Sequence, residues 1–239
     1  MSTFSVVATP IGNLEDITLR ALKVLASADL VLCEDTRMTK RLLDKHNISV
    51  ATKSYHMHSK ISRVDEIISL LRDGKNLALV SDAGTPGISD PGAELVSRIR
   101  KECSNEIANG EIKIEAIPGP SAVTSALSIA GVPCADFTFL GFLPHKKGRE
   151  TLFNEIARSE RTTVFYESPH RIMKSLESLV EHLTGAVSDE AHFKRVTVCR
   201  ELTKIFEEIV SGTPKEVKNY FEIHPDKVRG EFVVIVSRE

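Results

Sequence analysis

Short runs of apolar and β-branched residues recur along the chain at the length of buried strands. Most are continuous rather than alternating, a pattern typical of strands that are covered on both faces. The predicted strands are Phe4–Ala8, Leu30–Cys33, Leu77–Val80, Ile112–Ile117, Phe137–Leu143, Thr162–Tyr166, Val196–Cys199 and Phe232–Val236.

Segments with helical spacing of apolar residues lie between these runs. The clearest stripe runs from Ile61 to Leu71, and Asp73-Gly74 ends it. Further helices are predicted at Leu19–Leu25, Ala93–Arg100, Ser121–Ile129, Leu152–Ala157, Ile172–Leu183 and Pro214–Tyr220. Because parallel strands need a crossover connection, this alternation predicts an α/β fold in which each domain has a mainly parallel or mixed sheet flanked by helices.

The segment Ile117-Pro118-Gly119-Pro120 predicts a break between two domains. Its prolines cannot continue a central strand, and its glycine permits a sharp change of direction. We therefore place an N-terminal α/β domain at residues 1–117 and a C-terminal α/β domain at residues 118–239.

The composition is that of a globular protein that stays in the cytoplasm. Of 239 residues, 41% are hydrophobic and 27% charged, and no apolar stretch approaches the roughly 20 residues that cross a bilayer. The N-terminus lacks the basic start of a signal peptide. Cys33, Cys103, Cys134 and Cys199 are far apart, so we expect buried free thiols, with no disulfide and no metal.

The charge balance limits any contact with nucleic acid to local patches. The net charge is −2, Trp is absent and aromatic residues make up 5%, which argues against a protein that coats RNA. Basic residues do gather in strips, each of which could follow an RNA backbone or be ordinary solvated surface. The strips are His145–Arg149, then Arg37, Lys40 and Arg41, then Lys53, His56, His58, Lys60 and Arg63. The Gly141–Pro144 segment before the first strip predicts a mobile loop.

Polar loops follow the predicted strands. In open α/β sheets the loops at the carboxyl ends of the strands carry the ligand site, so we expect these loops to share one edge or cleft. They are Thr9–Asn13, Glu34–Arg37, Ser81–Gly92, Pro118–Ala122, Glu167–Arg171 and Arg200–Lys204.

The Ser81–Gly92 loop is suited to binding a ligand with its main chain. Its three glycines and two prolines define a rigid path that brings backbone close to a ligand, although a tight turn before a helix would need similar residues. The chain lacks a G-x-G-x-x-G fingerprint after its first strand and lacks a P-loop lysine. Small neutral loops therefore favour a zwitterionic or cationic ligand over a triphosphate.

Three of the loops combine acids with bases. Glu34 and Asp35 can accept a proton and Arg37 can hold phosphate, but the same residues could form a helix N-cap and a surface ion pair. Glu167–Arg171 is open to the same two interpretations, a catalytic or binding role and a structural role at the start of a helix. For Arg200–Lys204, a structural ion pair remains a competing interpretation.

Together these segments resemble the ribosomal RNA small subunit methyltransferase I family, a branch of the tetrapyrrole (corrin/porphyrin) methylases. The resemblance covers nearly the whole chain. It is carried by Val7–Thr18, Cys33–Arg37, Ser81–Gly92, Pro118–Ala122, Phe139–Pro144, Phe165–Arg171 and Arg200–Lys204.

The resemblance implies two α/β domains with S-adenosylmethionine in the cleft between them, in a homodimer. It also implies methylation of the ribose 2′-hydroxyl of a cytidine in the decoding region of 16S ribosomal RNA, and we expect the assembled small ribosomal subunit to be the substrate. By position, the donor pocket is expected to be lined by Ile11, Gly84, Thr85, Ile88, Ser121, Ala122 and Tyr166.

Methyl transfer from a sulfonium depends mostly on positioning, and a carboxylate that takes the hydroxyl proton would help. Our hypothesis gives this role to Glu34, Asp35 or Glu167. The residues expected to hold RNA are Arg37, His170, Arg171, Lys146, Lys147 and Arg149. Two alternatives stay open, namely a methyltransferase of this fold that acts on a small molecule such as a tetrapyrrole, and a donor-binding module without turnover.

Overall fold

The computed structural model of the chain describes residues 1–55, 61–184 and 194–238. It divides into two compact units, Met1–Ser121 and Ala122–Glu239. The division falls a few residues after the position at which the Pro118-Gly119-Pro120 segment predicts it.

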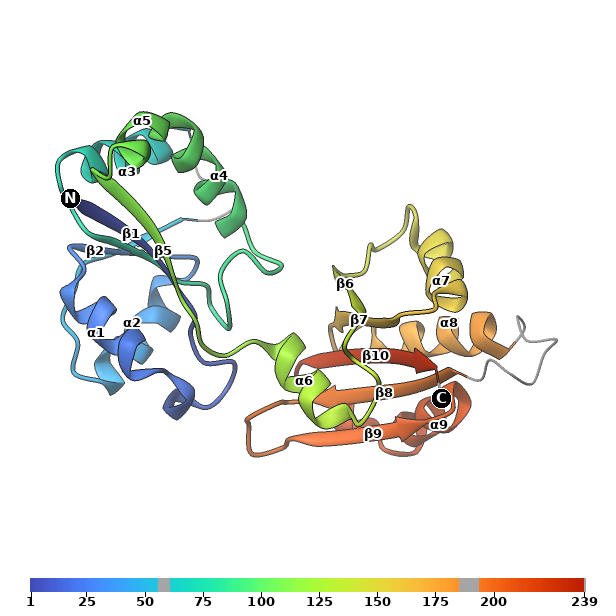
Figure 1. Cartoon of the computed structure of the whole chain (residues 1–239). Helices are drawn as coiled ribbons and strands as arrows, with labels where there is room; N and C mark the ends of the chain where they lie inside the picture. The colour runs from blue at the N-terminus through green and yellow to red at the C-terminus, as the bar shows by residue number, and fades with distance from the viewer. Residues whose placement is uncertain (56–60, 185–193, 239) are drawn as a thin grey trace. The chain divides into compact units, whose positions relative to one another are not determined.

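The first unit is built on a fully parallel sheet (Figure 1). Strand β1 pairs with both β4 and β5, while β2 pairs with β4 and β3, giving the order β3-β2-β4-β1-β5. The strands are β1 (Ser2–Val7), β2 (Leu30–Cys33), β3 (Thr52–Ser54), β4 (Leu77–Leu79) and β5 (Ile112–Ile117).

Helices cover both faces of this sheet, as the continuous apolar runs predict. Leu25 and Leu42 pack with Val7 and Val31 on one face, while Ile67 and Leu95 belong to the core on the other. The first face carries α1 (Leu19–Ser27) and α2 (Thr36–Lys45), the second α3 (Ile61–Arg72) and α4 (Gly92–Glu102), followed by the short α5 (Ser104–Ala108).

The second unit has a mixed sheet, which confirms the expected combination of parallel and mixed sheets flanked by helices. β6 and β7 are parallel, whereas β10 is antiparallel to both β7 and β8, and β8 is antiparallel to β9. The short Glu201–Glu207 connection between β8 and β9 leaves no room for a crossover helix. The strands are β6 (Phe137–Phe142), β7 (Thr162–Glu167), β8 (Lys194–Arg200), β9 (Glu208–Gly212) and β10 (Phe232–Arg238), in the order β6-β7-β10-β8-β9.

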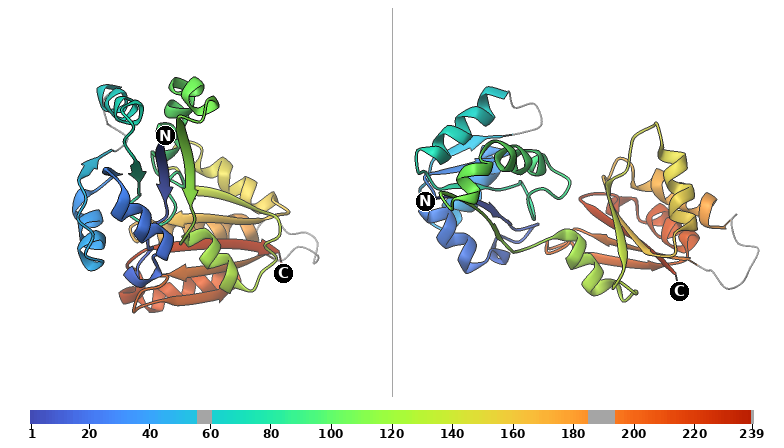
Figure 2. Two further views of the ribbon diagram at one scale, coloured as in Figure 1. Left: turned by 60° about the vertical axis from the view of Figure 1, so that its left-hand side comes forward. Right: turned by 45° about the horizontal axis from the view of Figure 1, so that its top comes forward.

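The helices of the second unit lie on opposite faces of its sheet. Phe153, Leu176 and Phe221, from three different helices, join Val198 and Val234 of the sheet in one core. Figure 2 shows α6 on the other face. The helices are α6 (Ala122–Ala130), α7 (Arg149–Arg158), α8 (Ile172–Thr184) and α9 (Pro214–Ile223).

The predicted strands and helices all exist, and the elements that the pattern missed are short or polar. β3 has three half-buried residues, β9 is an edge strand, and α2 buries a narrow stripe formed by Thr39, Leu42 and Leu43. Cys33, Cys103 and Cys199 are buried free thiols as expected, but Cys134 is exposed. No helix in the described part of the chain is long and apolar enough to cross a membrane.

The loop between β4 and α4 is shaped by one carboxylate and by left-handed backbone. Both oxygens of Asp90 accept the Gly87 N–H, and one also accepts the Gly92 N–H, at 2.7 to 2.9 Å. Gly84 and Gly87 have φ values of +80° and +87°, which glycine adopts without steric cost. The glycines of this loop therefore allow the backbone conformation that the loop adopts.

Replacing Gly92 by Ala is expected to lower the free energy of unfolding by about 1–3 kcal/mol. The added Cβ would lie 2.8 Å from Asp90 Oδ1 and 3.0 Å from Gly87 N. Urea unfolding followed by circular dichroism measures the change. Gly110→Asn is the control, because Gly110 has φ +74° and open space around it, and Asn tolerates this conformation. Equal losses in the two variants would contradict the packing argument.

Candidate functional site

The carboxyl edge of the first sheet has the topology of a ligand site. After β1 the chain passes through α1 on one face, whereas after β4 it passes through α4 on the other. β1 and β4 are neighbours, so the connections leave in opposite directions from adjacent strands. In open α/β sheets this switch point is where ligands bind.

Three loops are joined at this switch point. Thr9 and Gly84 exchange backbone hydrogen bonds of 2.9 and 3.0 Å, and the Thr85 hydroxyl donates to the Pro120 carbonyl at 3.1 Å. A Cβ at Gly84 would lie 3.4 Å from Ile11 Cγ2 and 3.7 Å from the Pro120 oxygen. These are ordinary van der Waals distances, so the loops after β1, β4 and β5 meet around Gly84, and it is the φ of +80° that favours glycine at this position.

The predicted donor residues of the first unit lie on or beside these loops. Ile11 is buried against the Gly84 backbone and Thr85 contacts the β5 loop. Ser121 directly follows Pro120. The Ile88 side chain is exposed, and the Ile88 N–H donates to the Thr85 carbonyl. Of the remaining two, Ala122 is the first residue of α6 and Tyr166 belongs to β7, both in the second unit.

Carboxylates give this edge a negative potential. Asp82 Oδ1 accepts the Asp35 N–H at 2.9 Å, which joins the β2 and β4 loops. Burial, followed by the charges of Asp82 and Asp90, raises the pKa of Glu34 above its usual 4.5. The first unit therefore presents neutral backbone loops beside several acids.

Asp35 and Arg37 have the structural role that the sequence left open. The Asp35 side chain caps α2 by accepting the Arg37 N–H at 2.8 Å, and its ion pair with the Arg37 guanidinium measures 2.6 Å. These contacts lower the pKa of Asp35 to about 2. Arg37 is 89% exposed, so the pair is a surface interaction.

In the second unit, polar loops follow the carboxyl ends of β6, β7 and β8 at one sheet edge. Tyr166, near that edge, packs edge-to-face against Phe139 and Phe142, with ring centroids 4.9 and 5.4 Å away. Burial raises the pKa of Tyr166 to about 12, while a hydrogen bond with the Val123 backbone opposes that rise. Tyr166 is therefore a protonated, largely apolar wall at neutral pH.

Glu167, one residue further, is fully buried in a network of hydrogen bonds. Its Oε1 accepts the Ser168 N–H at 2.9 Å and lies 2.8 Å from Arg171 Nε. Its Oε2 accepts the Ser175 hydroxyl at 2.6 Å and lies 3.8 Å from Arg149 Nη1. Both oxygens are thus occupied within the unit, an arrangement that favours a structural role over proton transfer.

Burial also removes Arg149 from the predicted RNA-binding strip. Its side chain is 10% exposed, its guanidinium donates to Ser175 Oγ at 2.8 Å, and it packs over the Phe153 ring. Arg171 is 17% exposed and donates to the Leu143 carbonyl at 2.7 Å. Lys146, Lys147 and His170 are exposed, as an RNA contact requires.

The segment before the basic strip, predicted to be a mobile loop, begins with the last two residues of β6, and its mobility stays a prediction. Leu143 is buried, and the carbonyls of Leu143 and Pro144 accept hydrogen bonds from Arg171 and Arg149. Of the third predicted strip, residues 56–60 lie outside the described part of the chain, while Lys53 and Arg63 both pair with Glu66.

The Arg200–Lys204 loop forms the structural ion pairs that the sequence allowed as an alternative. Lys204 Nζ pairs with Glu201 at 2.8 Å and with Glu231 at 2.7 Å, while Arg200 donates to the Phe206 and Arg229 carbonyls. These contacts hold a turn in which Glu201 and Thr203 have positive φ.

The sequence did not single out three residues that bind others at the two sheet edges. Asp82 binds Asp35, Asp90 binds the backbone of its own loop, and Ser175 binds Glu167. The two aspartates lie inside the Ser81–Gly92 loop, so their position after a buried strand could have marked them as candidate site residues. Ser175 lies on α8, eight positions after the acid that it binds, and a buried serine there looks like any helical serine.

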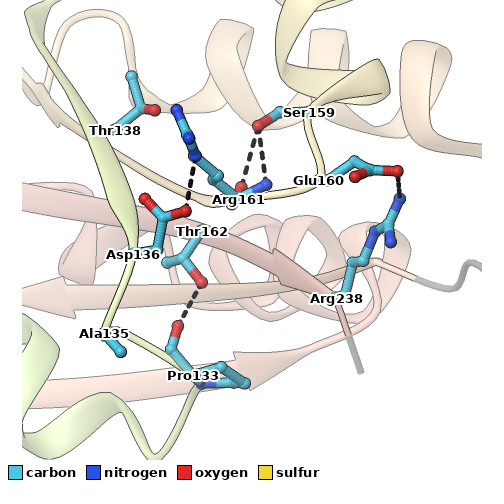
Figure 3. Close-up of a pocket in the computed structure, with 9 residues that line it drawn as sticks. All are labelled: Pro133, Ala135, Asp136, Thr138, Ser159, Glu160, Arg161, Thr162 and Arg238. Atoms are coloured by element: carbon cyan, nitrogen blue, oxygen red, sulfur yellow. Dashed lines mark hydrogen bonds and ion pairs between the residues drawn. The ribbon is translucent and has the colours of Figure 1, made fainter.

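A pocket of about 710 Å³ lies at the opposite edge of the second sheet, where β7 begins and β10 ends (Figure 3). Arg161 pairs with Asp136 at 2.7 Å and Arg238 with Glu160 at 3.2 Å. Its charged groups neutralise one another, so it lacks the surplus charge of the loop edges. Among the described residues, no cluster of His, Cys, Asp and Glu is arranged to hold a metal ion.

Comparison with known proteins places the chain in a family. The family model described as Tetrapyrrole (Corrin/Porphyrin) Methylases matches residues 3–218. The chain is 42% identical to the ribosomal RNA small subunit methyltransferase I of Thermotoga maritima, over 99% of each chain. It is 44% identical to the protein of that name from Vibrio cholerae, over 97% of this chain and 75% of the relative.

Solved structures share the fold at low sequence identity. A cobalt precorrin-4 methyltransferase of cobalamin biosynthesis has a TM-score of 0.65 at 17% identity, covering 99% of this chain and 94% of the other. A uroporphyrin-III C-methyltransferase from Thermus thermophilus, complexed with S-adenosylhomocysteine, has a TM-score of 0.62 at 16% identity, covering 99% and 97%. With its parallel and mixed helix-flanked sheets and its full-length similarity to these relatives, the chain belongs to the tetrapyrrole (corrin/porphyrin) methylase family, in its ribosomal RNA small subunit methyltransferase I branch.

Proposed function

We propose that the chain uses S-adenosylmethionine to methylate the ribosomal RNA of the small subunit, at the 2′-hydroxyl of a cytidine in the decoding region of 16S ribosomal RNA. The observation that carries the proposal is the identity of 42–44%, over nearly the whole chain, to relatives named ribosomal RNA small subunit methyltransferase I. The 2′-hydroxyl and the cytidine come from the family resemblance and are the finer part of the proposal.

The carboxyl edge of the first sheet suits a cationic donor. Its loops offer neutral backbone at Gly84 and Thr85, and the acids Glu34, Asp82 and Asp90 favour positive charge nearby. When bound, S-adenosylmethionine supplies an electrophilic methyl carbon. The first-unit residues assigned to hold it are Ile11, Gly84, Thr85, Ile88 and Ser121, while the contacts assigned to Ala122 and Tyr166 stay predictions.

The basic edge of the second unit suits RNA. Lys146, Lys147 and His170 are exposed there, and cationic side chains bind phosphate with an affinity that falls as salt rises. Such a local patch is compatible with the net charge of −2. The small ribosomal subunit as substrate and the homodimer stay predictions.

Among the three acids first considered, Glu34 is the best candidate for the base. Glu167 is buried with both oxygens bound, and the low pKa of Asp35 makes it a poor proton acceptor. Glu34 is half-buried, and burial together with the charges of Asp82 and Asp90 raises its pKa, which strengthens it as a base. In this proposal its carboxylate takes the proton of the ribose hydroxyl as the new bond forms.

Glu34→Gln is expected to lower kcat by about 10²–10⁴-fold, the usual contribution of a general base. Transfer of a labelled methyl group to small ribosomal subunits from a strain without the enzyme measures the rate, and calorimetry measures donor affinity. The control is Asp35→Asn, which keeps an N-cap and removes the neighbouring charge. Similar losses of kcat in both variants would argue that charge, rather than proton transfer, matters at this edge.

The rate is expected to fall at acid pH because the base must be deprotonated. Since burial and nearby acids raise the pKa of Glu34, activity is present above that raised pKa and is lost as the pH falls through it. The acid limb of the kcat profile should therefore lie above the usual glutamate value of 4.5 and disappear in Glu34→Gln. An unchanged acid limb in that variant would assign the titration to another group.

The substrate is tested by mapping ribose methylation in 16S ribosomal RNA with and without the enzyme. A single methylated cytidine in the decoding region is expected only when the enzyme is present. Methyl transfer to a tetrapyrrole but not to ribosomal RNA would support the small-molecule alternative. Donor affinity with no transfer to either would support a binding module.

A further inference from the structure

The connection that carries Lys146 and Lys147 is anchored at both ends. At its start, Leu143 is buried and its carbonyl accepts a 2.7 Å hydrogen bond from Arg171 Nη1. The Pro144 carbonyl lies 3.4 Å from Arg149 Nη1, and Arg149 is itself the first residue of α7. The lysines therefore lie on a short segment whose two ends are held by hydrogen bonds.

Both anchors converge on a single carboxylate. Glu167 binds Arg171 directly at 2.8 Å and reaches Arg149 through the Ser175 hydroxyl, which donates to Glu167 Oε2 at 2.6 Å and accepts from Arg149 Nη2 at 2.8 Å. Glu167 Oε1 also accepts the Ser168 N–H, at the start of the turn that carries His170. One buried acid thus connects the lysine segment with the histidine turn.

The electrostatics explain why these arginines stay inside. A fully buried carboxylate is unstable without compensating charge, and two guanidinium groups supply it. Burial lowers the pKa of Arg149, and the charge of Glu167 opposes that change. Moving either arginine outward to meet a phosphate would leave Glu167 undercompensated.

We propose that Glu167, Arg149, Arg171 and Ser175 form a positioning network that holds Lys146, Lys147 and His170 as one preformed RNA-binding surface. The inference rests on the proposed function, because it takes ribosomal RNA as the ligand. The network itself does not touch the RNA. Its effect is to remove the loop ordering that binding would otherwise require.

Ser175→Ala tests the network with a small change. It removes the hydroxyl between Glu167 and Arg149, and it is expected to weaken binding to small ribosomal subunits about tenfold, as for loss of a hydrogen bond to charged groups. Ser178→Ala is the matched control on the same helix, since the Ser178 hydroxyl donates to the Lys174 carbonyl one turn earlier rather than to a member of the network. Circular dichroism and thermal unfolding verify that each variant is folded.

A double-mutant cycle separates positioning from direct contact. In a background of Lys146→Ala, Lys147→Ala and His170→Ala, the Ser175→Ala change is expected to cost nothing further in subunit affinity, because the residues that it positions are gone. The same tenfold loss in both backgrounds would overturn the inference. Absence of binding by the unaltered chain would instead overturn the proposed function, and the inference with it.

Arg149→Lys gives a second, independent readout. Lys keeps the positive charge but lacks the planar fork that contacts Ser175 and the Pro144 carbonyl together. A positioning role predicts that Arg149→Lys and Arg149→Met weaken subunit binding equally. Near-normal affinity of Arg149→Lys, with a loss only in Arg149→Met, would show that charge alone matters and would overturn the role of the network.

Discussion

A buried carboxylate must be paired, and this requirement organises the functional edge of the second unit. Glu167 ends β7 without exposure to solvent, so the side chains of Arg149, Arg171 and Ser175 are drawn inward to satisfy it. The inward turn of the arginines brings their remaining donors to the Leu143 and Pro144 carbonyls. The path of the basic segment thus follows from where one negative charge lies.

In the first unit, backbone hydrogen bonds rather than buried charges hold the loops of the sheet edge together. Neighbouring parallel strands whose connections leave on opposite faces need loops that diverge from a common point. The Thr9–Gly84 bridge and the contact between Thr85 and Pro120 hold those loops together while leaving them uncharged. Glu34 and Asp82, in the β2 and β4 loops, add negative charge at this edge, which favours a cation there.

The two edges differ in the sign of their exposed charge, which the net charge of −2 conceals. Acids at Glu34, Asp82 and Asp90 suit a sulfonium, and bases at Lys146 and Lys147 suit a phosphate backbone.

The sequence by itself determined the α/β class, most of the strands and helices, and the polar loops that follow the strands. The spacing of apolar residues and the turn residues that mark these features act over short distances along the chain. The sequence also placed Gly84, Thr85 and Pro120 among the important loop residues. Only the tertiary structure decided which of the two sheets is mixed, that Asp35 serves as a helix cap, and that Arg149 and Arg171 face a buried Glu167. The physical reason is that burial and pairing of a charge depend on residues distant in the chain, and Ser175 on α8 gives no local sign that it completes the site.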